Sequence, residues 1–370
     1  MNIVIFGLSV SSAWGNGHAT LWRGLLRALN RRGHEIHFFE RDTPYYAAHR
    51  DAVSFPFAEL HLYSDWADNL PRAQQQLSRA DVGLVTSYCP DGIAACELAL
   101  ESGLDRTVFY DMDTPVTLSR LEKGESVPYL PPAGLADFDL ILSYTGGQAL
   151  EQLRERLGAR CVSTLYGWVD PEVYYPVERS AKFAADLSYL GTYSADRQAA
   201  LEELLLNPAQ RLGERKFVIG GAMYSGTQTW PENVRYFDHV PPQEHSEFYS
   251  SSPLTLNVTR GSMAAMGYCP SGRLFEAACC GTAVLSDWWV GLDTFFEPGE
   301  EIIIATSGAD AIAAIAKDRA EVARIGARAR QRALDCHTAE IRAQRFVELI
   351  ESPRDEMQEG QPNALASRGA

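Results

Sequence analysis

Short β-rich runs alternate with helical segments along most of the 370 residues, and this alternation constrains the fold more than any other feature. In the helical segment 19–31, Leu21, Leu25 and Leu29 share one face. Strands that alternate with helices predict βαβ units and a parallel sheet. The strands expected in the first half are residues 3–8, 35–39, 82–87, 107–110, 140–143 and 161–165, with further helices at 92–101 and 147–156.

A second series of the same kind follows residues 166–186, an irregular stretch rich in aromatic residues and proline. We interpret this stretch as an interdomain connection, because the chain is too long for one hydrophobic core. The pattern predicts an α/β protein of two Rossmann-like domains that face each other across a cleft. Ligands of such sheets bind beyond the carboxyl ends of the strands. The strands expected here are 187–190, 217–220, one near Tyr236, 254–258, 283–286 and 302–305, with helices from Ala195 and at 243–249 and 272–280.

The composition limits the classes of partner. The net charge of −15 disfavours nonspecific binding to nucleic acid or to an anionic membrane, so we expect no nucleic-acid partner. Neither a signal peptide nor an apolar run of about 18 residues is evident, so we expect no stable membrane insertion. The seven cysteines include no C-x-x-C pair, which favours free thiols in a reducing cytoplasm over disulfides or a zinc site.

An unusual loop follows the first strand, with the sequence SVSSAWGNGH at residues 9–18. Its glycines let a backbone turn tightly and approach a ligand, and the start of the next helix attracts an anion. His18 stands at that helix start, where an imidazole can accept a proton from a hydroxyl group. The loop is therefore either an acceptor or phosphate loop or a glycine-rich turn with a capping histidine. The residues predicted for the acceptor or phosphate loop are Trp14, Gly15, Asn16 and Gly17.

The same loop does not contain G-x-G-x-x-G, the fingerprint of dinucleotide-binding proteins. Glu40 or Asp42 remains a candidate for the acidic residue that would bind a ribose after the second strand. A nicotinamide-dependent enzyme therefore stays an alternative.

A pair of carboxylates, Asp111 and Asp113, follows another strand of the first half in the sequence YDMDTP. D-x-D holds a metal and a nucleotide diphosphate in one class of glycosyltransferases. The pattern favours a helix cap before Thr114 and Pro115, then an acceptor-side or catalytic carboxylate, over a metal site.

Two segments of the second half suggest an anion site. In the first, residues 191–197, glycine and hydroxyl side chains precede Arg197, as in phosphate-binding loops or in an ordinary turn. In the second, residues 256–287, Arg273 lies near a helix start, where the helix dipole opposes a cation unless an anion is close. Glu276 is suited to accept two hydroxyls, as a ribose presents them, or to pair with Arg273. The donor-binding candidates are Gly191, Thr192, Tyr193, Arg197, Arg260, Ser271, Gly272, Arg273 and Glu276.

Taken in order, these segments resemble the CgeB-like (spore maturation protein-type) glycosyltransferases, within the GT-B nucleotide-sugar transferases. The resemblance covers roughly residues 1–350 and is carried by SSAWGNGHATLWRGLLRAL, YDMDTPVTL, DLSYLGTYSADRQ and PSGRLFEAACCGTAVLSD. It implies that Glu276 binds the nucleotide ribose, that Ser271, Gly272 and Arg273 contact donor phosphates, and that His18 is a base or a sugar contact.

The resemblance also implies a domain plan. An acceptor domain at 1–170 precedes a donor domain at 171–335, and a helix at 336–350 crosses back to the first domain. The polar residues 351–370 are expected to be a disordered tail. Tyr268 occupies the position where retaining members of the wider group carry a second glutamate, so stereochemistry stays open. GT-B enzymes usually need no bound metal, so we expect none.

These observations predict a glycosyltransferase that moves a sugar from a nucleoside diphosphate-sugar, of UDP or dTDP type, to an acceptor hydroxyl. The acceptor would be a glycan or a small molecule. His18, Asp111 and Asp113 are the predicted catalytic residues. The alternatives are an NAD(P)-dependent oxidoreductase, a sugar-nucleotide epimerase or phosphorylase, and a non-catalytic nucleotide-binding scaffold.

Overall fold

The computed structural model describes residues 1–226 and 228–353, which divide into two compact units. Of the described residues, the first unit contains Met1–Tyr166 and 339–353, and the second contains Gly167–Thr338. Of the tail expected at 351–370, Glu351 is the last residue of a helix, and residues 354–370 lie outside the described part of the chain.

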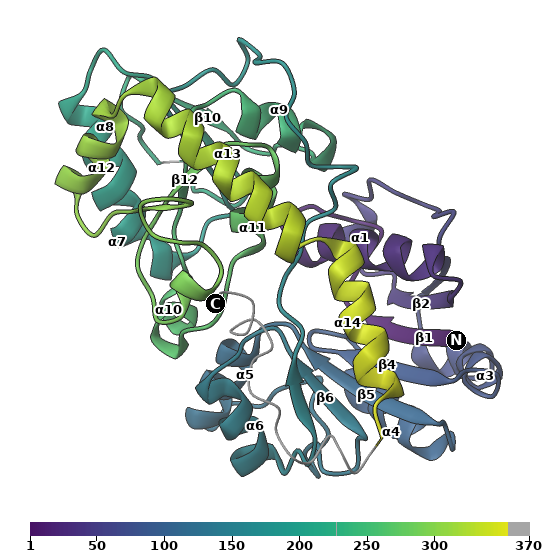
Figure 1. The fold of residues 1–370 in the computed structure, drawn as a ribbon. Helices are drawn as coiled ribbons and strands as arrows, with labels where there is room; N and C mark the ends of the chain where they lie inside the picture. The colour runs from purple at the N-terminus through teal and green to yellow at the C-terminus, as the bar shows by residue number, and fades with distance from the viewer. Residues whose placement is uncertain (227, 354–370) are drawn as a thin grey trace. The chain divides into compact units, whose positions relative to one another are not determined.

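The first unit is built on a seven-stranded parallel sheet with the order β3-β2-β1-β4-β5-β6-β7 (Figure 1). The order reverses between β1 and β4, and open sheets of this kind bind ligands at such a switch point. The strands are β1 (Asn2–Gly7), β2 (Glu35–Arg41), β3 (Glu59–Tyr63), β4 (Val82–Thr86), β5 (Arg106–Asp111), β6 (Leu140–Ser143) and β7 (Val162–Thr164). The helices are α1 (Gly17–Arg31), α2 (Pro44–Ala47), α3 (Trp66–Leu77), α4 (Gly92–Glu101), α5 (Thr114–Glu122), α6 (Gln148–Leu157) and α14 (Ala339–Glu351).

Helix α1 shows how the sequence places the elements of this unit. Its apolar face, with Leu21, Leu25 and Leu29, is buried, and the polar face is left to solvent. Helix α14 packs against α1, and an Arg32 Nε–Glu340 Oε1 ion pair of 2.8 Å joins them (Figure 1). Arg106 Nε also donates to the Ile350 carbonyl oxygen at 2.8 Å. The last described helix is therefore part of the first unit.

The second unit contains a six-stranded parallel sheet with the order β10-β9-β8-β11-β12-β13. Both faces of its central strands are buried, so Ser188, Thr255 and Ser286 are buried along with the apolar residues of these strands. The strands are β8 (Leu187–Leu190), β9 (Phe217–Gly220), β10 (Val234–Phe237), β11 (Leu254–Asn257), β12 (Ala283–Ser286) and β13 (Ile303–Ile304). The helices are α7 (Gln198–Leu201), α8 (Asn207–Arg211), α9 (His245–Ser250), α10 (Gly261–Met266), α11 (Gly272–Cys279), α12 (Gly308–Ala316) and α13 (Arg319–Cys336), with short 3₁₀ segments at Ala195–Arg197, Pro242–Glu244 and Leu292–Thr294 and a π-helical turn at Glu202–Leu206 between α7 and α8.

Some elements were not among the sequence-based expectations, and the short helix α2 is one of them. Strand β3 and helix α3 were not predicted, and α3 contains Pro71 in its interior. Helix α10 was also missed, because residues 261–266 lie in a stretch that we expected to be a loop.

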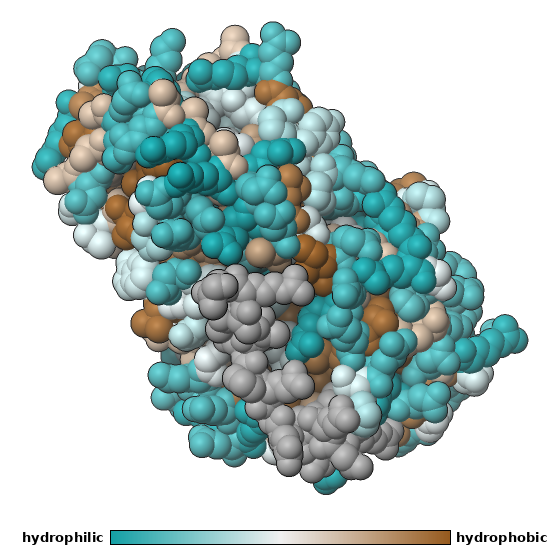
Figure 2. Space-filling view, viewed as in Figure 1, coloured by the Kyte–Doolittle hydropathy of each residue, from teal (hydrophilic) through white to brown (hydrophobic). Residues whose placement is uncertain are grey.

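The surface is mostly polar. Figure 2 shows a face dominated by hydrophilic residues, on which the hydrophobic ones form separate patches. The exposed large hydrophobic side chains are Tyr45, Val53, Tyr175, Tyr193, Met223, Trp288 and Val290. Among the described residues, no helix combines the length and apolar character needed to span a bilayer.

Candidate functional site

The loop between β1 and α1 is held by its own polar side chains. Asn16 caps α1 by accepting a hydrogen bond from the His18 backbone N–H at 3.1 Å, and its Nδ2 donates to the Ser9 and Ser12 carbonyl oxygens. Gly15 has a φ of +60°, a conformation that favours glycine. A Cβ at Gly17 would meet no atom within 4 Å, so packing within the protein does not require a glycine there. The cap of this helix is therefore Asn16 rather than the histidine.

Glu40 at the end of β2 organises the same loop. Its buried carboxylate accepts four hydrogen bonds, from the Val10 and Ser11 backbone N–H groups at 2.7 and 2.9 Å and from the Ser9 and Ser11 hydroxyls at 2.9 and 2.5 Å. Asp42 accepts a hydrogen bond from Arg50 at 2.6 Å. Glu40 is thus occupied by protein donors, in the position where a dinucleotide enzyme would offer a carboxylate to a ribose.

His18 and Asp113 are brought together at the carboxyl edge of this sheet. The loops after β1 and β5 place His18 Nε2 3.6 Å from Asp113 Oδ2, and both side chains are partly exposed. Asp113 precedes α5 but makes no side-chain capping bond, so helix capping does not explain it. A carboxylate beside an imidazole can orient the ring and stabilise its protonated form.

Asp111 is the buried member of the carboxylate pair. Its Oδ1 accepts from the Asp113 backbone N–H at 3.1 Å, and its Oδ2 has no hydrogen-bond partner among the described residues. Burial raises the pKa of Asp111 to about 7, because the loss of solvent penalises the charged form more than nearby donors favour it. A carboxyl group with this pKa exchanges its proton near neutral pH.

In the second unit, the loop after β8 brings the Gly191 backbone close to the side chains of Tyr189 and Arg273. A Cβ at Gly191 would lie 2.6 Å from the Tyr189 hydroxyl and 2.9 Å from Arg273 Nη2, so only glycine fits without moving them. Arg197 donates from Nη2 to the Thr192 carbonyl oxygen, and its Nε has no hydrogen-bond partner among the described residues. Tyr193 is exposed, and its backbone N–H donates to the Ala222 carbonyl oxygen.

Arg273 in the first turn of α11 turns back toward this loop. Ser271 caps the helix, and the Arg273 guanidinium donates to the Leu190 carbonyl oxygen and to Asn257 Oδ1, the latter at 2.7 Å. The guanidinium lies 5.1 Å from the centre of the Tyr189 ring. Within the described residues, Arg273 makes no ion pair with Glu276. The alternative that Glu276 pairs with Arg273 is therefore wrong. Glu276 instead accepts a hydrogen bond from the Tyr249 hydroxyl at 3.2 Å.

Three arginines therefore converge at the carboxyl edge of the second sheet. The positive charges of Arg273 and Arg260, after the larger effect of burial, lower the pKa of Arg197. Arg260 is partly balanced by Asp196, whose Oδ2 lies 3.7 Å from its Nε. Like charges at one edge of a sheet repel one another in the free protein, and a bound anion would offset that repulsion. The group formed by Arg197, Arg260 and Arg273, together with the backbone of 191–193 and 271–272, is called the arginine site below.

Several contributing residues were missed from the sequence. Glu40 was considered only as a ribose ligand, and the serines at positions 9 and 11 were not recognised as its partners. Asn257 at the end of β11 and Tyr189 on β8 position Arg273. Polar residues at the carboxyl end of buried strands are the signal that would have indicated Asn257.

Residues 197–348 match a family model described as glycosyl transferase-like. This segment begins at Arg197 and includes Arg260, Arg273 and Glu276. No curated protein matches the chain in sequence.

Solved structures resemble nearly the whole chain. Sucrose-phosphate synthase from Thermosynechococcus elongatus superposes with a TM-score of 0.67 at 14% identity, over 94% of this chain and 98% of that one. HepE of Anabaena in complex with UDP-glucose gives 0.63 at 13% identity, over 95% and 100%. An alpha-glucosyltransferase in complex with UDP and DNA gives 0.66 at 14% identity, over 95% and 99%. The fold is thus that of the GT-B glycosyltransferases, with two Rossmann-like domains.

Proposed function

We propose that the protein is a glycosyltransferase that moves a sugar, of the hexosyl type, from a nucleoside diphosphate-sugar to an acceptor hydroxyl. The observation that carries this proposal is the arginine site, because three guanidinium groups beside a glycine loop fit a diphosphate. The match of residues 197–348 to glycosyl transferase-like proteins supports it independently.

The donor is proposed to bind the second unit. Glu276 is half-buried and would accept the ribose hydroxyls, while Ser271, Gly272 and the backbone of Gly191, Thr192 and Tyr193 would contact the phosphates and sugar. UDP or dTDP is the proposed nucleotide, and UDP agrees with the structural neighbours crystallised with it. Arginine side chains would stabilise the leaving diphosphate, so we propose that transfer needs no metal.

The acceptor is proposed to be activated in the first unit. The acceptor oxygen attacks the anomeric carbon of the donor, its proton passes to His18 Nε2, and the bond from that carbon to the diphosphate breaks with its electron pair. Asp113, 3.6 Å from Nε2, would hold the imidazole and stabilise its protonated form. Asp111 would assist by positioning Asp113, whose backbone N–H donates to Asp111 Oδ1 at 3.1 Å. The loop from Trp14 to Gly17 would form the floor under the acceptor, a glycan or a small molecule.

We propose the finer assignment to the CgeB-like glycosyltransferases because the sequences of the loops after β1, β5, β8 and β11 resemble that family. We also propose a cytoplasmic location, since all seven cysteines are free and six of them are buried. An NAD(P)-dependent oxidoreductase is disfavoured because Glu40 is engaged by four protein donors.

The test is donor consumption by the full chain, followed as release of the nucleoside diphosphate from UDP- and dTDP-sugars with a panel of glycan and small-molecule acceptors. Glu276→Gln should raise the donor KM strongly while leaving the acceptor KM unchanged. Glu247→Gln, a glutamate in the first turn of α9, is the matched control. An unaltered donor KM for Glu276→Gln would exclude the ribose role. Nucleotide binding without turnover on any acceptor would instead indicate a non-catalytic scaffold.

A further inference from the structure

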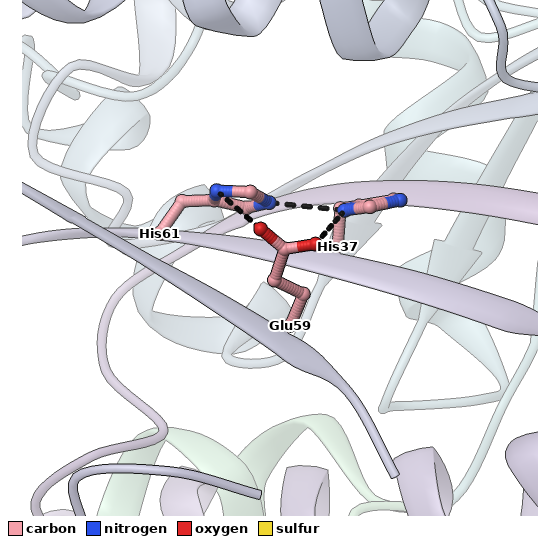
Figure 3. A group of neighbouring side chains, drawn as sticks. All are labelled: His37, Glu59 and His61. Atoms are coloured by element: carbon pink, nitrogen blue, oxygen red, sulfur yellow. Dashed lines mark hydrogen bonds and ion pairs between the residues drawn. The ribbon is translucent and has the colours of Figure 1, made fainter. Parts of the chain in front are cut away.

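A second group of chemically active side chains lies at the edge of the first sheet. His37 is on β2, and Glu59 and His61 are on the neighbouring edge strand β3 (Figure 3). His37 is in register with Glu59, and residues two apart along a strand point to the same face. The three side chains therefore share one face, and Figure 3 shows the Glu59 carboxylate reaching toward both imidazole rings.

The spacing of the nitrogen and oxygen atoms suits a metal ion. His37 Nδ1 lies 3.0 Å from His61 Nε2 and 3.4 Å from Glu59 Oε2. Two ligands bound to one tetrahedral ion at about 2.0 Å lie about 3.3 Å apart. One ligand atom from each residue falls within 4.8 Å of the others, so a small shift brings all three around one ion.

The two imidazole rings of the cluster are buried, whereas the Glu59 carboxylate is exposed. His37 and His61 are 4% and 0% exposed, and His61 Nδ1 lies 3.6 Å from Glu59 Oε1. Glu59 is exposed, so its side of the cluster is open to a water ligand.

Other side chains hold the rings in place. Glu35 Oε1 lies 3.6 Å from His37 Nε2, the nitrogen that does not face His61. A carboxylate at that nitrogen fixes the tautomer and orientation of a metal-binding histidine. The His61 ring stacks on Phe39 at a centroid distance of 4.4 Å. Arg72, whose Nη2 is 3.4 Å from Glu59 Oε1, is the competing cation, and it is half-exposed.

We propose that His37, Glu59 and His61 bind a divalent transition metal, Zn²⁺ first, with water as the fourth ligand. Two imidazoles and one carboxylate suit Zn²⁺, whereas Mg²⁺ and Ca²⁺ prefer oxygen ligands alone. The site lies nearer the amino end of β2 and β3, whereas the residues proposed for sugar transfer follow the carboxyl ends of strands. The metal is therefore structural: it fastens the edge strand β3 to β2.

The test is the metal content of the full chain, stripped with a chelator and dialysed against buffered ZnCl₂. One equivalent of Zn²⁺ should be retained, and Co²⁺ should give the visible absorption of a tetrahedral complex. Glu59→Gln should raise the Kd for Zn²⁺ by roughly 100-fold or more, and Glu35→Gln by about 10–100-fold. Zn²⁺ should also raise the thermal midpoint of the wild-type chain and not that of Glu59→Gln.

Glu101→Gln is the matched control, since it removes an exposed glutamate of the same unit at the end of α4. Glu59 is exposed, so its variant separates loss of a ligand from loss of the fold. A wild-type chain that retains no Zn²⁺, or a Glu59→Gln variant that binds as the wild type does, would overturn the proposal. The cluster would then be a plain hydrogen bond between two buried imidazoles.

Discussion

His18 carries the proposed proton transfer, and it stands beside a carboxylate rather than inside a network of other bases. His18→Ala should lower kcat by about 10²–10⁴-fold, the usual contribution of a general base, with little change in donor KM. Steady-state kinetics with saturating donor measures this. His34→Ala, also in the first unit, is the control and should retain full activity. Full activity of His18→Ala would show that the base lies elsewhere.

Asp111 makes the stability of the first unit depend on pH. Its pKa is about 7 in the folded chain against 3.8 in the unfolded one, so the folded state binds the extra proton between these values. This group's stabilisation is therefore present at low pH and is lost as pH rises toward 7, by roughly 4 kcal/mol at most. Asp111→Asn mimics the protonated carboxyl and removes this dependence.

Urea unfolding of the wild type and Asp111→Asn at pH 5 and pH 8 measures the effect. The variant should gain stability relative to the wild type between the two pH values. Asp113→Asn is the comparison, because Asp113 is partly exposed. An Asp111→Asn difference that stays constant across this range would mean that Asp111 is ionised throughout.

At the scale of elements, the β1–α1 loop depends on β2 through Glu40. Glu40→Gln removes the negative charge and replaces one of the two acceptor oxygens by an NH₂ group, so two of the four donors lose their acceptor, which should cost roughly 2–3 kcal/mol. Hydrogen exchange in peptides covering residues 9–13 should speed up, and kcat should fall because His18 follows this loop. Glu101→Gln should change stability by less than about 0.5 kcal/mol. Wild-type exchange in Glu40→Gln would contradict the role given to Glu40.

A second prediction at the scale of elements concerns the close packing around Gly191 in the loop after β8. In Gly191→Ala, the new methyl group would displace Tyr189 and Arg273 without touching distant core residues. We expect kcat/KM for the donor to fall by roughly 10–100-fold, because the arginine site loses its geometry. Gly213→Ala is the control, since a Cβ there meets nothing within 4 Å. Equal kinetics for the two variants would remove Arg273 from the donor site.

Sequence patterns were sufficient to predict the helices and strands that have a regular apolar spacing. Helix α1, with its regular leucine spacing, and strand β9, with its apolar run, were predicted within a few residues. Strand β3 was missed because ELHLY is short, lies on the sheet edge and has a glutamate and a histidine among its five residues. With β3 unrecognised, the matching E-x-H patterns of 35–37 and 59–61 were not compared. Helix α3 was missed because Pro71 lies in its interior.

At the scale of the whole molecule, the sequence indicated two Rossmann-like domains, and the structural neighbours confirm them. The partners of Arg273 could not be predicted, because Leu190 and Asn257 become neighbours only through the β8–β11 pairing.

The expectation that nucleic acid is not a partner stays a prediction, since one structural neighbour was solved with DNA. The net charge of −15 still argues against nonspecific binding.

The most direct test of the donor site is a thermal-shift panel on the full chain. It would compare UDP, dTDP, GDP, ADP, CMP, NAD and NADP at equal concentration. A ligand at 100 times its Kd stabilises the native state by about 2.7 kcal/mol, enough to raise the melting point visibly. The proposal predicts that UDP or dTDP raises it, and that Glu276→Gln reduces the shift. Stabilisation by NAD or NADP alone, or by none of the seven, would contradict a nucleoside diphosphate-sugar transferase.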